Sequence, residues 1–544
     1  MTEIVLTYWS PRKAGRKKLN LWSTILEKST SMKHYFLKPI CLWAICCSLV
    51  VSAFAASPVV APENVRNLRL LENSPMLFEL HQVTTGEGRQ FFSYPRRDTT
   101  FRKNFLKTEG NALLGYDNVH GGSILGKGRS ADSAQPRIAL AVSLVGGLDY
   151  RGGEALGDTV WPSIDGGIYL RGFADSVDFV LDARIYDEGH SASNPKSFDG
   201  EFLEVQKEEN NSGIEYTSYA RYRTHFAFNH DWFRLDLGRD VLHWGPGYYN
   251  NLSLNQFALP YNMLTMDLTF GPLRVVSFYA DLRIYSSMSM KNKDESRNLF
   301  GHRYELAVGN GTFGISELQM LYDNMKPWLF VPTAPLFMEK GNYSEDSNNG
   351  SLSFDFNYRL FRSVRLYTEF FLDDMESPVS LVKNDNIEAK WAWMAGLQGA
   401  HDFVIKGHLL EAGTIAEYAR IEPYVYSHFH KNTAQLAHLG RPIGNQNGPN
   451  SQTIDWTVYG RLDHRIFASL RNTWYWKGTD YGSALNDTTP RVDHMKIHKD
   501  FLNGAKMEYS LTPSVSYEGE RLFYLAEITL FNDEKIYLRG GFKW

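Results

Sequence analysis

Residues 177–185 already indicate the fold, since they read Val177-Asp178-Phe179-Val180-Leu181-Asp182-Ala183-Arg184-Ile185. Every odd position is apolar, whereas the even positions include two aspartates and an arginine. Because successive side chains of a β-strand point to opposite faces, one face of this strand suits lipid and the other suits water. A soluble sandwich could alternate in the same way, so the fold class depends on whether the pattern recurs.

The pattern recurs along the chain, and the end of the chain is especially informative. The last strand places five residues on one face, the final one an aromatic at the last position: Ile536, Leu538, Gly540, Phe542 and Trp544. Two other stretches, 273–286 and 363–374, alternate in the same sense. We expect their apolar side chains to face lipid and their polar side chains, including Arg283, Arg365 and Glu369, to face the interior.

This rhythm predicts eighteen strands between residue 136 and the C-terminus. The turns after even-numbered strands are tight, and the connections after odd-numbered strands are mostly long, which is typical of short periplasmic turns and long extracellular loops. The sequence therefore predicts an all-β fold, a transmembrane outer-membrane β-barrel of about 18 antiparallel strands at 136–544. The predicted strands are 138–149, 163–174, 175–188, 216–229, 231–241, 263–271, 273–286, 300–309, 313–323, 350–360, 363–374, 389–400, 408–421, 452–463, 465–477, 503–518, 520–532 and 534–544.

The N-terminal residues predict that the protein is exported from the cytoplasm. Residues 32–55 have a basic start, an apolar core and a small-residue cleavage site, as signal peptides do. The core is about 12 residues long, which is too short to span a bilayer. Residues 1–31 then form an upstream extension from a misplaced start. We expect residues 56–135 to be a periplasmic or lumen-filling plug segment with one short helix near 63–72.

Composition narrows the function. All three cysteines, Cys41, Cys46 and Cys47, lie in the signal peptide, so the mature chain has neither a disulfide nor a thiolate metal site. Without residues 1–55 the chain has 49 Lys and Arg against 59 Asp and Glu, a net charge near -10. An acidic chain argues against nucleic acid as a partner. The predicted location is the cell outer membrane, with lipid around the barrel.

Two glycine-proline motifs interrupt the alternating pattern of the strands. The first runs from Leu237 through Trp244-Gly245-Pro246-Gly247 to Asn255, and the second covers 417–428 and 440–450, including Tyr426-Ser427-His428 and Gly444-Asn445-Gln446-Asn447-Gly448-Pro449-Asn450. Proline lacks a donor and glycine permits positive φ, so each motif must break its strand and turn sharply.

Together these motifs resemble the capsule assembly protein Wzi family of outer-membrane lectins, in which a Gly-Arg precedes Trp-Gly-Pro-Gly and a Tyr-Ser-His precedes a Gly-x-x-x-Gly-Pro loop. The resemblance is close at the motifs and loose over 160–544. It implies a blocked 18-stranded barrel that holds capsular or exopolysaccharide at the cell surface without chemical turnover or a cofactor, with polysaccharide-export components as further partners. Residues 56–135 do not match the family's helical N-terminal part.

A polysaccharide site would draw on the two motifs and the polar inner face. Guanidinium groups can bind uronic carboxylates bidentately, and aromatic rings can stack on sugars. In the alternative interpretation, arginines and aspartates of the lumen neutralise each other as a network. The loop of the first motif then folds inward only to close the lumen. The candidate substrate-binding residues are Arg221, Arg223, Arg234, Arg239, Asp240, His243, Trp244, Tyr248, Tyr249, Tyr426 and His428.

No catalytic or metal motif is apparent. The chain has no Gly-x-Ser-x-Gly, His-Glu-x-x-His or glycine-rich phosphate loop. Residues 346–350 start like a calcium loop but lack the distal glutamate, so a solvated loop is the better interpretation. Scattered carboxylates such as Asp373 and Asp374 show no catalytic spacing. We therefore expect a protein that is not an enzyme, with a porin or saccharide channel as the main rival and an outer-membrane hydrolase or lipid-modifying enzyme as a lesser one.

Overall fold

The structure is a computed structural model, and the residues that it describes lie within Val60–Trp544. The predicted signal peptide, the upstream extension, the helix expected at 63–72 and Trp544 lie outside the described residues. The described residues are 74–86, 138–152, 161–174, 176–191, 214–284, 296–322, 325–333, 335, 336, 338, 348–374, 389–428, 434–487, 500–519, 522–532 and 534–543.

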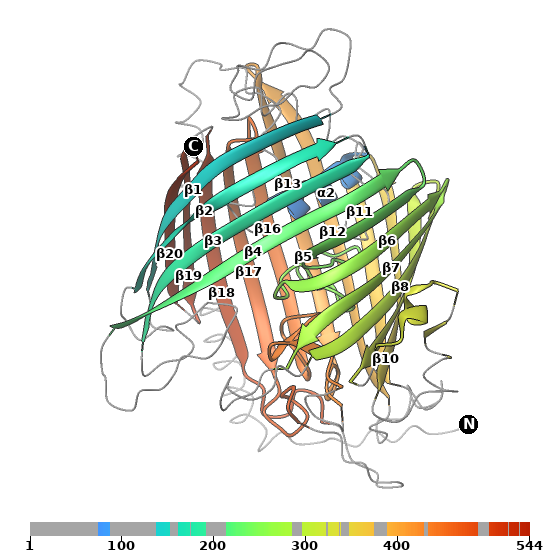
Figure 1. Ribbon diagram of the computed structural model, residues 1–544. Helices are drawn as coiled ribbons and strands as arrows, with labels where there is room; N and C mark the ends of the chain where they lie inside the picture. Colours follow the sequence, from blue (N-terminus) through green and yellow to red (C-terminus); the bar gives the residue numbers. More distant parts are fainter. Residues whose placement is uncertain are drawn as a thin grey trace, which may run out of the picture. The chain divides into compact units, whose positions relative to one another are not determined.

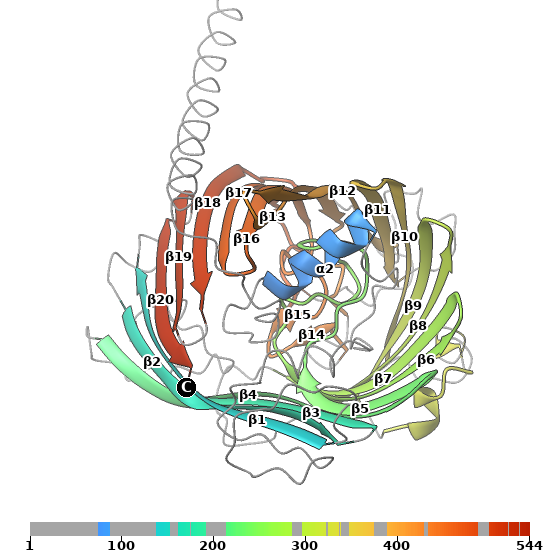
Figure 2. The ribbon, with the colours of Figure 1, turned by 90° about the horizontal axis from the view of Figure 1, so that it is seen from above.

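The strands close into a barrel of eighteen (Figures 1 and 2). Each strand pairs antiparallel with the next, and β1 closes the circle by pairing with β20 from Val145↔Lys543 to Gly152↔Ile536. The predicted fold class and strand count are confirmed, and the boundaries differ by at most five residues. The barrel strands are β1 Ile138–Gly152, β2 Trp161–Ala174, β3 Val177–Ser191, β4 Ile214–His230, β5 Phe233–Asp240, β6 Tyr261–Phe270, β7 Leu273–Arg283, β8 Ser296–Val308, β9 Gly311–Leu321, β10 Asn349–Phe361, β11 Val364–Asp374, β12 Lys390–Ile405, β13 His408–Ile421, β16 Ser451–Leu462, β17 Ile466–Lys477, β18 Met507–Glu518, β19 Leu522–Phe531 and β20 Lys535–Lys543.

The outer face is apolar over most of the barrel. On β3, Ile185 points outward and is 67% exposed, whereas its neighbour Arg184 points inward and is buried. On β5, Leu237 is 61% exposed beside the buried Asp236. This arrangement satisfies the two demands of a membrane barrel, an apolar belt outside and paired backbone groups throughout.

Strand β7 reverses the predicted orientation. Its apolar residues Val276, Phe278, Ala280 and Leu282 are fully buried on the inner face, because a loop packs against them inside the barrel. The prediction that Arg283 faces the interior is therefore wrong, since the alternation places Arg283 outside, 3.6 Å from Asp281. Apolar patterning identified the strand but could not say which side was apolar.

A short segment covers the polar outer face of β7 and β8. The 3₁₀ helix η3, Pro327–Phe330, lies outside these strands (Figure 1). The His302 imidazole is 2.8 Å from the Leu329 carbonyl, the Ser277 hydroxyl donates to the Phe330 carbonyl, and the Tyr304 hydroxyl donates to the Pro332 carbonyl. These bonds satisfy groups that would otherwise be unpaired on the outer face.

The interior holds one described helix, α2, Ser74–Thr85 (Figure 2). Leu77, Phe78 and Leu80 pack on Ile415 and Tyr459 of the wall. Thus part of the segment expected to be periplasmic or lumen-filling does enter the lumen. Among the described residues, no helix is long and apolar enough to cross a membrane.

The outward position of Leu237 generates a stability prediction. Leu237→Arg should lower the free energy of unfolding by about 2 kcal/mol, because arginine on the lipid-facing side of a membrane barrel is costly. The measurement is equilibrium denaturant unfolding in lipid bilayers. Ala484→Arg, in an exposed loop, is the control and should change little. Equal stability of the two variants would contradict a lipid-facing position for Leu237.

Candidate functional site: a partition in the lumen

The connection from β5 to β6, residues 241–260, folds into the lumen and is here called the partition. It doubles back on itself, so that the Trp244 amide donates to the Leu254 carbonyl at 3.1 Å. Gly245 has φ of +118°, and a Cβ there would approach Asn251 and Glu369 to within 3 Å. Glycine is required at this turn, as the first motif predicted.

Glu417 of β13 fixes the middle of the partition. Its carboxylate accepts hydrogen bonds from three consecutive backbone amides, those of Tyr248 at 2.6 Å, Tyr249 at 2.9 Å and Asn250 at 3.0 Å. The Tyr367 hydroxyl also donates to Glu417, at 2.8 Å. A buried carboxylate is costly unless hydrogen bonds satisfy it, and this one is satisfied by the loop it holds.

Glu369 of β11 fixes the next turn in the same way. It accepts the amides of Leu252 at 2.8 Å and Ser253 at 3.0 Å. Together the two glutamates bind five amides of one loop, so the partition is attached through its backbone rather than through interchangeable side chains. Such an attachment makes the partition a fixed part of the barrel.

The second motif packs against the first. The Tyr426 hydroxyl donates to the Leu252 carbonyl at 2.7 Å, and Asn445 Nδ2 donates to the Asn250 side-chain oxygen at 3.0 Å. Asp373 of β11 accepts the Tyr426 amide at 2.7 Å. A two-residue hairpin, β14 Ala437–His438 with β15 Arg441–Pro442, belongs to the same loop. The two motifs therefore form one assembly in the lumen.

The predicted aromatic candidates are mostly inaccessible. Trp244 is fully buried with its ring 5.0 Å from Phe278 at an interplanar angle of 79°, and Tyr248 is 2% exposed. His243, Tyr426 and His428 are also buried. For these side chains the geometry favours the alternative in which the loop folds inward for closure.

Tyr249 is the partly exposed member of the group. The Arg471 guanidinium lies over its ring, 3.9 Å from the ring centre, and the ring of Phe257 is parallel to it at 6.2 Å. Its hydroxyl is 2.9 Å from that of Thr457. Burial raises the pKa of Tyr249 to about 12, so the phenol stays neutral.

The predicted arginines are mostly in ion pairs. Arg234 contacts both Asp178 and Asp236 at 2.9 Å, and Arg223 lies 3.5 Å from Asp240. His225 Nε2 is 2.8 Å from Asp240. These contacts match the expected neutralising network and leave little free charge for an anionic sugar.

Two further candidates stack on aromatic rings. The Arg221 guanidinium lies 5.2 Å from the ring centre of Tyr186 inside the barrel. Arg239 lies 5.0 Å from the ring centre of Tyr222. Arg239 occupies the opposite face of β5 from Asp240, so the structure does not bring Arg239 together with the other candidates.

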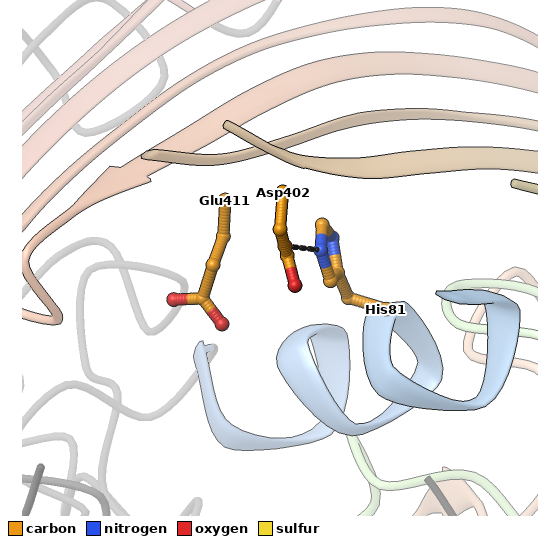
Figure 3. A group of neighbouring side chains, drawn as sticks. All are labelled: His81, Asp402 and Glu411. Carbon is orange, nitrogen blue, oxygen red and sulfur yellow. Dashed lines mark hydrogen bonds and ion pairs between the residues drawn. The ribbon is translucent and has the colours of Figure 1, made fainter. Parts of the chain in front are cut away.

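A group of possible metal ligands joins α2 to the wall (Figure 3). His81 Nε2 is 2.6 Å from Asp402, a hydrogen-bond distance that leaves no room for an ion between them, and His81 Nδ1 is 3.0 Å from the Tyr459 hydroxyl. Both oxygens of Glu411 accept from Arg461, at 2.5 and 2.7 Å. The arrangement is that of a docking contact for α2 rather than a metal site.

The sequence did not reveal the carboxylates that fix the partition. Alternation predicted that Glu369 faces inward, and Glu417 begins the second motif, but neither signal names the loop that each binds. The partners of Glu417 lie 167–169 residues away along the chain. No local pattern encodes such a contact.

The fold and this assembly define a closed membrane-type β-barrel with a partition of folded-in loops. No protein-family model and no curated protein matches this chain. Among solved structures, it is similar to Wzi, an outer-membrane protein of Escherichia coli involved in group 1 capsule assembly and described as a carbohydrate-binding β-barrel, with 14% identity over 74% of this chain and 84% of Wzi and a TM-score of 0.48.

This chain is also similar to porins, at comparable sequence identities, coverages and TM-scores. A BenF-like porin from Pseudomonas fluorescens Pf-5 matches at 8% identity over 75% of this chain and 98% of its own, with a TM-score of 0.40. OccAB1 of Acinetobacter baumannii matches at 10% identity over 75% and 95%, with a TM-score of 0.38. Sequence identities and TM-scores this low do not indicate a particular function.

The attachment of the partition is testable through Glu417. Glu417→Ala should leave three loop amides without their acceptor and lower the free energy of opening the loop by about 3 kcal/mol. Chymotrypsin should therefore cleave at Tyr248 and Tyr249 about two orders of magnitude faster. Glu411→Ala is the control, because Glu411 is a buried glutamate of the same strand that pairs with Arg461 and His464. Wild-type cleavage rates for Glu417→Ala would show that this carboxylate does not hold the loop.

Proposed function

We propose that this chain is a lectin-like barrel of the cell outer membrane that binds capsular or extracellular polysaccharide and helps to assemble or attach it at the cell surface. It carries out no chemical turnover. The observation that carries the proposal is the partition, a loop fixed across the lumen through its backbone by Glu369 and Glu417.

A fixed partition suits stationary binding better than passage. A channel needs a continuous aqueous path, and five charge-assisted amide bonds to buried glutamates oppose the opening of this loop. The motif resemblance to the Wzi family supports polysaccharide as the ligand. We infer that the outer loops and the upper lumen carry the binding surface.

The rival function is a porin or saccharide channel. It is favoured by the side chains of β17, β18 and β19, several of which are partly exposed on the inner face beside the partition. An eighteen-stranded barrel is wide enough to hold both a folded loop and a water-filled path. Conductance therefore has to be measured together with binding.

The test is retention of the cells' own purified surface polysaccharide on the detergent-solubilised protein, together with ion conductance in a planar bilayer. The proposal predicts retention and little conductance, because the partition obstructs the lumen. High conductance without retention would support the channel instead. Time-dependent shortening or deacylation of the polymer would contradict non-enzymatic binding.

Trp244→Ala distinguishes direct stacking from packing. Because the ring is fully buried against Phe278, the variant should lose polysaccharide retention and protease resistance of the partition together. Loss of retention with an intact, protease-resistant partition would instead assign Trp244 to direct sugar contact. Leu237→Ala, on the outer face, is the control and should retain both properties.

A further inference from the structure

The inner faces of β17, β18 and β19 present a strip of hydroxyl groups beside the partition. The register of the strands sets these residues side by side, for example Ser469↔Ser514 and Arg471↔Thr512, and Ser514↔Glu527. We call this set the hydroxyl strip; its members are Ser469, Ser510, Thr512, Ser514, Ser516 and Thr529.

Alternation fixes the direction of the strip. The neighbouring residues Val515, Tyr517, Tyr524 and Ile528 are apolar and 38–51% exposed on the outer face. The hydroxyl residues therefore point inward. Four of them, Ser469, Ser510, Thr512 and Thr529, are only partly buried, and the hydroxyls of Thr512 and Thr529 lie 3.2 Å from each other.

Glu527 lies within the strip and differs from the other inner-face carboxylates described above. It is partly buried, and no hydrogen bond or close ion pair joins it to any of the described residues, although the Arg471 guanidinium attracts its charge from a longer distance. Asp236, Asp240, Glu369 and Glu417 by contrast all have close partners. A half-buried carboxylate whose oxygens accept no hydrogen bond from the described residues is an acceptor available to a ligand.

Aromatic residues of the partition lie beside the hydroxyl strip and form part of the same surface. The Phe257 and Tyr249 rings stack in parallel, and the Arg471 guanidinium lies over the Tyr249 ring. Arg471 is itself neutralised, since its Nε and Nη2 donate to Asp455 at 2.9 and 2.7 Å. The surface thus combines hydroxyls, one free acceptor and aromatic side chains, and it carries no uncompensated positive charge at Arg471.

We infer that the hydroxyl strip with Glu527 is a glycan-binding surface that selects uncharged sugar residues, recognising their hydroxyl groups rather than carboxylates. This inference rests on the proposed function and names the class of sugar. Sugar hydroxyls donate to Glu527 and exchange hydrogen bonds with the serine and threonine hydroxyls. A uronic carboxylate would meet repulsion from Glu527 and from Glu508, an exposed carboxylate at the end of the strip opposite Tyr475.

The arginines elsewhere in the lumen are not available to bind a sugar carboxylate. Arg223 and Arg234 of the opposite wall are paired with aspartates, as described above. A polyanionic polymer would have to break those pairs, and removing one partner of a buried pair leaves an uncompensated charge. The strip needs no such rearrangement.

The experiment compares retention of two forms of the cells' surface polysaccharide: the native polymer and the same polymer after chemical reduction of its uronic carboxylates to primary alcohols. Carboxyl reduction should leave retention unchanged or strengthen it. Glu527→Gln should weaken the retention of both forms about tenfold, the effect of losing one charged hydrogen bond. Thr512→Val, which keeps the side-chain shape, should weaken retention severalfold.

Glu534→Gln is the control, because it makes the same charge change in the exposed turn between β19 and β20 and should bind as wild type does. Loss of retention on carboxyl reduction, or wild-type retention by Glu527→Gln, would overturn the inference while the proposed function stands. Failure of the wild type to retain either polymer would instead reject the proposed function. Migration of unheated samples on gels verifies that each variant is folded.

Discussion

The pairing of β1 with β20 is the constraint from which the rest of the structure follows. In lipid an unpaired backbone amide or carbonyl costs several kcal/mol, so a sheet that spans a membrane must close on itself. Closure with eighteen strands produces an interior too wide for wall side chains to fill. The interior is occupied instead by α2 and by loops that belong to strand connections.

Buried carboxylates then serve two purposes inside the barrel. On β5, the buried Asp236 and Asp240 neutralise arginine and histidine side chains, together with the half-buried Asp178 of β3. On β11 and β13, Glu369 and Glu417 bind the backbone amides of the partition. In both cases a buried charge is retained because it has donors close by. Glu527 accepts no hydrogen bond from the described residues and is attracted only at longer range by Arg471, which is why it suggests a ligand.

The region around β7 shows how a filled lumen changes the wall. Where the partition contacts the barrel, the wall supplies apolar side chains such as Phe278 to its inner face. Ser277 of the same strand and His302 of β8 then point outward, where they meet the carbonyls of the segment around η3. The inside and the outside of the barrel thus exchange their usual polarity over a small area, and an external segment compensates for it.

The sequence by itself determined the strands, their number and the positions of the two motif loops. Alternation and turn residues are local signals, because strand direction and chain reversal depend on adjacent residues. It also separated Arg365 and Glu369, which face inward, from the lipid-facing residues of β11. Tertiary structure alone decided that Trp244 is buried, that Arg283 faces outward and that Glu417 binds amides 167–169 residues away. These outcomes depend on which loop fills the closed barrel, and closure brings together segments whose separation along the chain leaves no local pattern.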